Sequence, residues 1–271
     1  MVMHKVLPLV ATIATIGFAQ IQSIGSLGTV DWGSRTVTAV GIGAPNPNMP
    51  EATYRPMAIQ AARNVALRNA LELIKGLQMT SSTTVENFMV TSDVIRTSVD
   101  GYIRKFSTSE PRFMSDKTIE ITVTIPLDND LAATVLPNTV TQVPTATVVS
   151  QVSPSSAPGY TGLVIDARGT GAIPALIPKI VDEDGKEVYG SAYVSRDWAI
   201  KWGMAGYAKT PEQAATFKDR VGAQPGMIKA LRATGASRCD IVISNQDALN
   251  VRAAAKGSKF FSDCRVIIVV D

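Results

Sequence analysis

The chain has 271 residues, of which 45% are hydrophobic, 18% charged and 6% aromatic, and its formal net charge is +3. This apolar content is well above that of disordered chains, and the length suits two modest folded domains. Nucleic-acid binding needs a concentrated basic face, and the sequence shows no basic run interleaved with aromatic residues, so we expect no nucleic-acid partner.

The first 19 residues have the pattern of a secretory signal peptide. Lys5 supplies the positive start, Val6 to Phe18 form a mostly apolar stretch, and Gly17-Phe18-Ala19 offers small residues to a signal peptidase. The apolar stretch of about 13 residues is shorter than the roughly 20 that a membrane-crossing helix needs. We therefore expect cleavage after Ala19 and an exported, periplasmic protein with no membrane span.

Known catalytic arrangements are mostly eliminated by the residues that are missing. The only histidine, His4, lies in the predicted signal peptide. A Ser-His-Asp or Cys-His arrangement therefore cannot form, and the commonest zinc ligand is absent. Gly169-Thr170-Gly171 lacks the third glycine of a dinucleotide-binding loop. We expect a protein that is not an enzyme, with no catalytic residue, no cofactor and no metal site.

Residues 30–136 are predicted to form a first α+β domain. Thr36 to Ile42 alternates β-branched and small residues, which predicts a strand. Met57 to Leu77 has an apolar stripe at spacings of three and four, which predicts a helix with Pro56 near its start. A weaker helical pattern covers 92–101. Residues 102–113 and 117–125 are predicted to be antiparallel strands, the second with one face open to water.

Residues 137–159 are predicted to be an extended linker. The stretch carries Pro137, Pro144, Pro154 and Pro158 among Thr, Ser, Val and Gln, with almost no charge and no helical period. Because proline fixes its own φ and biases the preceding residue toward extended geometry, such a stretch spaces domains while packing poorly.

Residues 160–271 are predicted to form a second α+β domain. The predicted strands are 162–166, 179–181, 187–189, 227–233, 240–244 and 265–270, and the predicted helices are 196–202, 211–221 and 246–256. Asn245 is expected to cap the last helix, and strand, helix, strand implies that the last two strands are a parallel pair. The predicted fold class is α+β, with two small domains joined by a Pro/Ser/Thr-rich linker, each a mixed or antiparallel sheet with helices packed on it.

Two cysteines precede the last two predicted strands. If these strands are parallel neighbours, Cys239 and Cys264 lie side by side at their beginnings. An exported compartment permits oxidation, so we predict a disulfide that closes a loop of about 25 residues. Two separate buried thiols are the alternative, because a disulfide also demands suitable Cβ geometry.

Two further groups of residues invite a functional interpretation but favour a structural one. Asp182, Glu183 and Asp184 lack the alternating ligands and the distant glutamate of a calcium loop, so we expect a solvated hairpin turn. Trp198 and Trp202 stand four residues apart and share one helix face. We expect them to lie in the core or at an interface rather than to form a sugar platform.

The run from Ala58 to Ala70, between a glycine-ended strand and a threonine-rich stretch, resembles the N-terminal domain of the flagellar assembly proteins FlgT and FlgP and their envelope lipoprotein relatives. The positions that carry the motif are Ala58, Ala62, Arg63, Ala66 and Ala70. The resemblance covers about residues 30 to 135, and residues 160–169 and 179–185 look like segments that follow this domain in periplasmic members. It implies a structural or assembly role at the cell envelope, in a non-lipidated member with an additional C-terminal α+β domain, because no anchoring cysteine is present.

The alanine-rich stripe allows a close approach to a sheet or to another helix. Ordinary core packing is one interpretation, and contact with another subunit is the other. The leading hypothesis is a non-enzymatic periplasmic structural or assembly protein, associated with a flagellum or another envelope machine, that binds envelope proteins and forms a homo-oligomer. The alternative is a peptidoglycan- or polysaccharide-binding protein, or a glycosidase that depends on paired carboxylates.

Overall fold

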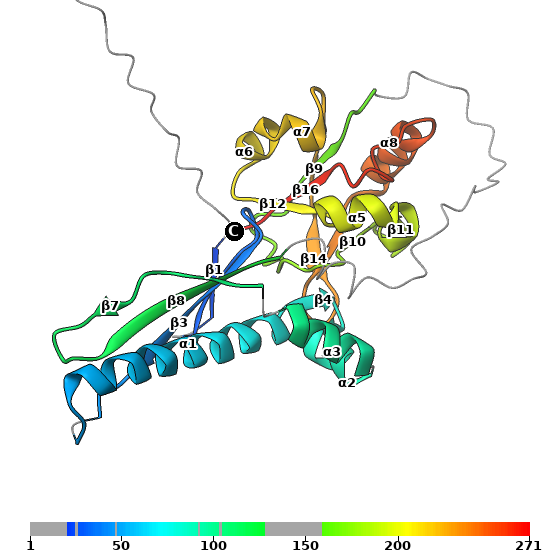
Figure 1. Cartoon of the computed structure of the whole chain (residues 1–271). Coiled ribbons are helices and arrows are strands. Elements are labelled where there is room, and N and C mark those ends of the chain that lie inside the picture. Colours follow the sequence, from blue (N-terminus) through cyan, green and yellow to red (C-terminus); the bar gives the residue numbers. More distant parts are fainter. Residues whose placement is uncertain (1–20, 25–26, 47, 92, 103–104, 128–158) are drawn as a thin grey trace, which may run out of the picture.

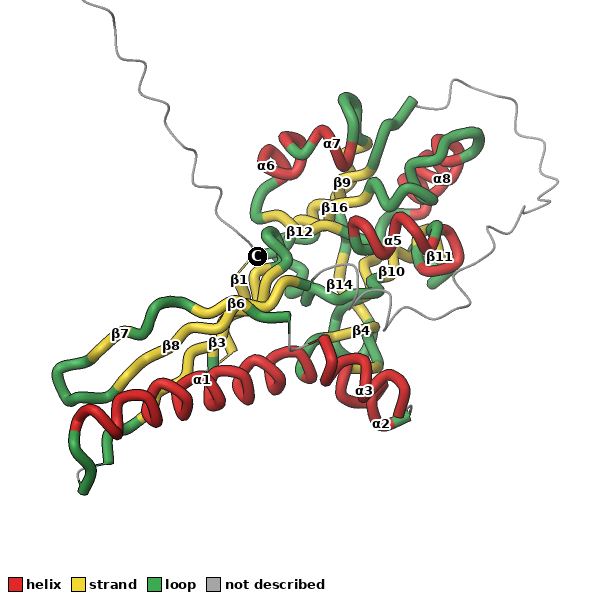
Figure 2. Tube along the Cα trace, viewed as in Figure 1, coloured by secondary structure: helices red, strands yellow, loops and turns green. Residues whose placement is uncertain are grey.

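The computed structural model describes residues 21–271 apart from 25–26, 47, 92, 103–104 and 128–158. These residues form helices and several sheets, so the predicted α+β fold class is confirmed (Figures 1 and 2). The predicted signal peptide and nearly all of the predicted linker lie outside the described residues. Within the described ranges, every helix is too short or too polar to span a membrane.

An antiparallel sheet forms the first part of the molecule. Its strands are β1 (Ile21–Ile24), β2 (Gly28–Asp31), β3 (Thr36–Gly43), β6 (Ser107–Thr108), β7 (Arg112–Phe113) and β8 (Ile119–Pro126), in the order β1-β2-β3-β8-β6, with β7 also paired with β8. The long strands β3 and β8 alternate buried and more exposed residues, because one face of the sheet is packed and the other faces solvent. The predicted strands over 36–42 and 117–125 are confirmed. Residues 102–113, predicted to be one strand, hold only the two-residue strands β6 and β7.

The packed face of this sheet is covered by α1 (Glu51–Lys75), which runs along the strands in Figure 2. We call α1 and the six-stranded sheet the arm. The helix begins six residues before the predicted start at Met57, and Pro56 lies inside it. The prediction placed the start too late because proline is most common in the first turn of a helix. Here the helix accepts proline in its second turn, at the loss of one backbone hydrogen bond.

The helix and the sheet approach each other unusually closely. A Cβ added at Gly41 or Gly43 of β3 would overlap the backbone of α1, so only glycine fits at these positions. The α1 residues that face the sheet are small and buried: Ala58, Ala62, Ala66 and Ala70. The amide Nδ2 of Asn69 also donates to the Val40 carbonyl at 2.7 Å, which ties the helix to β3.

Short elements connect α1 to the rest of the sheet. They are the hairpin of β4 (Gln78–Thr80) and β5 (Thr83–Thr84), followed by α2 (Val85–Val90) and α3 (Asp93–Tyr102). The Thr84 hydroxyl accepts a hydrogen bond from the Asn87 backbone at 3.3 Å and caps α2. The helix predicted over 92–101 is confirmed as α3.

The C-terminal part, residues 159–271, contains two four-stranded sheets where one was predicted. The first is entirely parallel, in the order β12 (Gly206–Ala208), β16 (Val266–Val269), β9 (Leu163–Asp166) and β13 (Gly226–Lys229). The second is mixed, in the order β11 (Glu187–Tyr189), β10 (Lys179–Val181), β15 (Asp240–Val242) and β14 (Arg232–Thr234). The bounds predicted for β10 and β11 agree with the structure.

The predicted strand over 227–233 is two strands, one in each sheet. The Ala230 backbone N–H donates to the Asp166 carbonyl in the first sheet, and that of Leu231 donates to the Val242 carbonyl in the second. The chain thus changes sheets between two consecutive residues without a turn residue to mark the change. Strands β15 and β16 also lie in different sheets, so the prediction that they form a parallel pair is wrong.

The helices of the C-terminal part are α5 (Arg196–Trp202), α6 (Pro211–Thr216), α7 (Lys218–Val221) and α8 (Asn245–Ala255), with a 3₁₀ turn, η1 (Ser191–Tyr193). Helices α6 and α7 cover one face of the parallel sheet with a small apolar core of their own. The helix predicted over 211–221 is interrupted at Phe217. Ser244, rather than Asn245, caps α8, because its Oγ accepts from the Asp247 backbone at 3.0 Å.

The arm and the C-terminal part share one continuous hydrophobic core. Backbone N–H groups of residues 176–177 donate to the carbonyls of residues 78–79 at 2.9 and 2.7 Å. Trp32 of the arm packs edge-on against Tyr207, with ring centroids 5.3 Å apart. The two parts are therefore packed against each other and not only tethered.

Candidate functional site

The alanine stripe on α1 is core rather than an interaction surface. Ala58, Ala62, Ala66 and Ala70 are at most 2% exposed and lie against β3, so the interpretation that the stripe meets another subunit is wrong. Arg63 lies beside the stripe and is half-buried, and its Nε has no hydrogen-bond partner among the described atoms. The motif residues thus hold the arm together.

Large apolar side chains gather instead at one end of the arm. In Figure 1 this is the end of α1, β3 and β7 that lies farthest from the C-terminal part. The exposed side chains there, which we call the apolar tip, are Ile42, Met49, Met57, Phe113 and Met114. They are 36–56% exposed, so each keeps a large part of its surface in water. Grouped apolar exposure of this kind marks interaction sites more often than scattered exposure does.

Strand register places the residues of the sheet at the same end, but on its two faces. Gly43 and Phe113 both pair with Ile119, and Ile42 and Arg112 both pair with Glu120, so the ends of β3 and β7 flank the start of β8. Because Gly43 and Ile119 face α1, Phe113 lies on the α1 face and Ile42 on the opposite face. The apolar tip therefore surrounds the end of the sheet and extends onto the first turns of α1.

Two arginines frame the apolar tip. The Arg55 guanidinium lies 4.8 Å from the centroid of the Phe113 ring and pairs with Glu51 at 3.1 Å. Arg112 pairs with Glu120 at 3.2 Å on the other face of the sheet. Aromatic residues, methionine and arginine are the types enriched where proteins meet. The composition of this surface thus suits a protein partner.

The edge of β3 beside the apolar tip is open among the described residues. Strand β2 pairs only with residues 36–39 of β3, whereas β8 pairs with all eight of its residues. Residues 41–43 therefore have a strand on one side only, and an open edge can accept a strand from another chain. Gly41, Ile42 and Gly43 carry no charge that would oppose such pairing.

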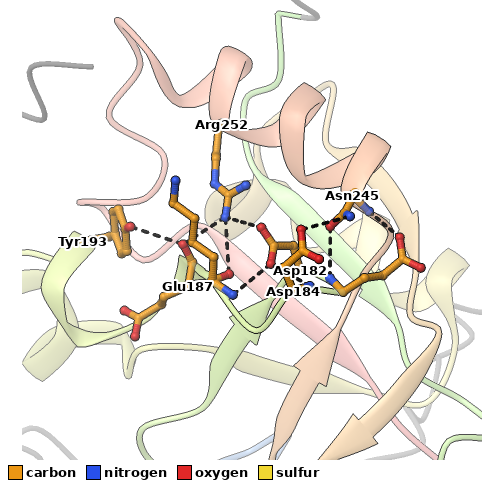
Figure 3. Close-up of polar contacts among 8 residues, drawn as sticks. Asp182, Asp184, Glu187, Tyr193, Asn245 and Arg252 are labelled. Carbon is orange, nitrogen blue, oxygen red and sulfur yellow. Dashed lines mark hydrogen bonds and ion pairs between the residues drawn. The ribbon is translucent and has the colours of Figure 1, made fainter. Parts of the chain in front are cut away.

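The acidic cluster forms the predicted hairpin turn between β10 and β11, with Glu183 and Asp184 exposed, but Asp182 is buried and the cluster also binds α8 (Figure 3). Asp182 is only 5% exposed. Its carboxylate accepts hydrogen bonds from the backbone N–H groups of Asp184 and Lys186 at 3.2 and 2.8 Å and from Arg252 Nη2 at 2.9 Å. Burial disfavours the charged carboxylate, but these hydrogen bonds outweigh it and hold the pKa of Asp182 below its ordinary value.

The two neighbouring carboxylates bind the start of α8. The Asn245 backbone donates to Glu183 Oε2 at 2.8 Å, and its side chain donates to Asp184 Oδ2 at 3.2 Å. Arg252 donates to the Glu187 carbonyl as well, at 3.2 Å. All three acidic residues thus fasten the β10–β11 turn to α8, and Figure 3 shows these contacts together.

Both cysteines are free and buried. Cys239 precedes β15 and Cys264 precedes β16, which lie in different sheets, so the neighbouring strands on which the predicted disulfide depended are not found. Burial raises the pKa of the Cys239 thiol to about 12 and that of Cys264 to about 11. Thiols with such pKa values are poor nucleophiles at neutral pH. The alternative of two separate buried thiols describes the structure.

The paired tryptophans on α5 lie on either side of a lysine side chain. Trp198 and Trp202 on α5 are both half-buried, and Lys201 Nζ lies 4.8 and 5.8 Å from their ring centroids. This arrangement agrees with a place at the margin of the core. Within the described ranges, no group of three or more His, Cys, Asp or Glu residues could hold a metal ion.

The apolar tip was not predicted from the sequence, although several of its residues lie beside turns or in loops, where large apolar side chains are exposed. Phe113-Met114 stands directly before the turn at Ser115-Asp116, and Met49 lies in the loop between β3 and α1. Large apolar residues next to turns have little structure to cover them, because loops lie on the surface. Ile42 was assigned to a strand, and the alternation of that strand already places its side chain opposite the core.

Comparison with known families concerns the C-terminal part. Residues 162–271, from just before β9 to the last residue, match the family model described as Treponema pallidum Tp0624, second domain. The match covers about two fifths of the chain. No curated protein matches this chain. The resemblance of the first part to FlgT and FlgP stays a prediction.

Proposed function

We propose that this chain is a non-enzymatic structural or assembly protein of the bacterial cell envelope, exported to the periplasm, that acts by binding other proteins through the apolar tip of its arm. The observation that carries the proposal is the grouping of five exposed large apolar side chains at one end of the molecule. The link to the envelope, and to a flagellum or a similar machine, rests on the predicted signal peptide and the resemblance of the run from Ala58 to Ala70.

The arm suits this role because it is long and stiff. Its helix of 25 residues extends for roughly 37 Å at 1.5 Å per residue. The close contact of Gly41 and Gly43 with α1 leaves the helix little freedom to shift on the sheet. A partner would therefore meet a preformed surface, and binding would not require the arm to become ordered.

The chemistry of the apolar tip favours a protein over a polysaccharide. Burying a large apolar side chain completely contributes about 1.5–3 kcal/mol, and the five residues of the tip are each at least one third exposed. Open backbone groups at residues 41–43 add the means for strand pairing. A second copy of this chain offers the same combination, which is consistent with a homo-oligomer.

Site-specific photo-cross-linking in intact cells tests the proposal. The cross-linker p-benzoylphenylalanine replaces Phe113, which is 54% exposed at the apolar tip, or Leu249, which is 61% exposed on α8. We expect a discrete cross-linked protein, either a second copy or another envelope protein, from position 113 and not from position 249. Equal products from both positions, or none from position 113, would contradict the proposal.

A further inference from the structure

A hollow of about 370 Å³ lies between the arm and the C-terminal part. Its walls include Trp32 and Arg35 from the turn between β2 and β3, and Trp202, Tyr207, Phe217 and Arg220 from the C-terminal part. Sites for small molecules commonly have volumes of about 300–1,000 Å³ and combine apolar walls with a few polar groups. This hollow lies at the lower end of that range and has the same mixed lining.

Arg220 is a buried cation without a carboxylate partner in the described part of the chain. It is 8% exposed, and its guanidinium donates to the carbonyls of Trp202, Gly203 and Val266 at 2.6, 2.9 and 3.0 Å. These bonds use three of the five N–H donors of a guanidinium. Burial lowers the pKa of Arg220 to about 10, so the group stays charged at neutral pH. Buried charges are normally paired with an opposite charge.

A second guanidinium, that of Arg35, faces the same hollow from the arm. A Cβ added at Gly203 would lie 3.7 Å from Arg35 Cζ, and the Gly203 carbonyl also accepts from Arg220. The two arginines thus flank one residue, and the charge of Arg35 further lowers the pKa of Arg220. Arg35 has a φ of 54°, an uncommon conformation for a residue other than glycine. Such conformations are found preferentially at functional sites.

The other walls of the hollow are mostly apolar, with Thr216, Lys218 and Asp219 at its lining. Lys218 and Asp219 are both exposed there, and their opposite charges cancel, so the formal charge of the lining comes from the two arginines. Arg35 also donates to the Lys201 carbonyl at 3.3 Å. The Tyr207 hydroxyl is occupied, because it donates to the Ala175 carbonyl at 2.7 Å and accepts from the Ala175 backbone N–H at 2.9 Å. Tyr207 therefore contributes its ring rather than its hydroxyl. The chemistry is that of two guanidiniums beside aromatic surfaces.

We propose that this hollow binds a small organic anion, with a phosphate or carboxylate that pairs with Arg35 and Arg220 and a flat or apolar body that packs on Trp32 and Trp202. The anion supplies the counter-charge that the described residues do not give Arg220. Because Arg35 belongs to the arm and Arg220 to the C-terminal part, the bound anion also joins the two parts.

Tryptophan fluorescence of the full-length protein tests this site, since two of the three tryptophans line it. The probes are phenyl phosphate and benzoate, with benzyl alcohol as the neutral counterpart and inorganic phosphate as the anion without a ring. We expect saturable quenching by at least one of the two aromatic anions, with affinity at least about tenfold above that for benzyl alcohol and for inorganic phosphate. The aromatic anion that binds more tightly identifies the preferred charged group.

Matched arginine variants connect the binding to the site. Arg35→Gln should weaken binding of the tighter aromatic anion by about tenfold or more. Arg232→Gln, at an exposed position on β14 away from the hollow, should leave it unchanged. The proposal is overturned if neither aromatic anion gives saturable quenching or if the two variants behave alike. Equal affinity for inorganic phosphate and phenyl phosphate would overturn the role of the aromatic walls.

Discussion

The arm and the C-terminal part differ in how completely their sheets are covered. In the C-terminal part, β16 is buried along all four residues, because α6 and α7 cover one face of its sheet and the main core covers the other. In the arm, β8 alternates buried and more exposed residues, because α1 covers one face only. A continuous apolar strand needs two covered faces, and an alternating strand leaves one face free.

This difference predicts that substitutions in the two parts have different consequences. The C-terminal part places most of its apolar residues in covered sheets, and its exposed ones, such as Met227 and Leu249, lie on different elements. By contrast, the arm keeps a polar sheet face, an open strand edge at residues 41–43 and the apolar tip exposed. We therefore expect substitutions of residues buried in the core to lower the free energy of unfolding. Substitutions at the apolar tip should instead weaken binding to a partner.

The largest expected effect is at the contact that joins the two parts. Trp32→Ala removes a ring that is 5% exposed and packs against Tyr207, so the free energy of unfolding should fall by about 3–5 kcal/mol. The free energy of unfolding is measured by urea unfolding of the full chain, monitored by circular dichroism. A loss below about 1 kcal/mol would mean that the arm and the C-terminal part do not depend on this contact. Trp198→Ala, at a half-buried ring on α5, is the control and should cost less.

The next largest loss of stability is expected where α1 contacts β3 within the arm. Gly41→Val places a branched side chain where even a Cβ overlaps the backbone of Ala62 and Ala66, so α1 must move away from β3. We expect the free energy of unfolding to fall by about 3 kcal/mol, at the upper end of overpacking effects. The same unfolding measurement applies.

Gly101→Ala is the matched control for this substitution. A Cβ at Gly101 of α3 meets nothing within 4 Å, so the variant should be unchanged or more stable by about 0.5–1 kcal/mol. Similar losses for both glycines would show that the close approach of helix and sheet is not what Gly41 provides.

Local patterns in the sequence were enough to predict much of each part. Alternation identified β3 and β8, the spacing of alanines identified the buried face of α1, and turn residues bounded β10 and β11. Each of these features is decided by residues close together in the chain. The predicted helix over 196–202 agrees with α5 for the same reason.

Features that depend on distant residues could not be predicted in this way. Which strand pairs with β15 or β16 is decided by residues as far away as β10 and β9, so the two sheets of the C-terminal part were taken for one. No sequence pattern pointed to the buried position of Arg220. It lies in a four-residue helix, and its hydrogen-bond partners are backbone carbonyls, which every residue has. Whether an outward-facing residue such as Ile42 meets solvent likewise depends on the whole fold.

A smaller effect is expected at the joint between the β10–β11 turn and α8. Asp182→Asn removes the charge that Arg252 binds, and the free energy of unfolding at neutral pH should fall by about 2 kcal/mol, as for hydrogen bonds between charged groups. The pKa of Asp182 is lowered in the folded protein, so its contribution is fully present above the unfolded value of 3.8. It is lost as the pH falls through the lower folded pKa.

Urea unfolding at neutral pH and at several pH values below 3.8 therefore tests the sign of this contribution. The difference between the wild-type protein and Asp182→Asn should shrink as the pH falls. Asp197→Asn, at an exposed position on α5, is the control and should stay within about 0.5 kcal/mol of the wild type. A difference for Asp182→Asn that grows toward acid would contradict the assigned direction of the pKa shift.

The smallest effect on stability is expected at Phe113, and a buried phenylalanine, Phe260, provides the comparison. Phe113→Ala at the apolar tip should change the free energy of unfolding by no more than about 0.5 kcal/mol, because the ring is already 54% exposed. Phe260→Ala, at a ring only 2% exposed in the core, should cost about 3–5 kcal/mol. In cells, the folded Phe113→Ala protein should nevertheless lose the cross-link formed from a probe at Met57. Retention of that cross-link would contradict the proposed contact, because Phe113 is the only aromatic residue of the apolar tip and a partner bound there should lose affinity without its ring.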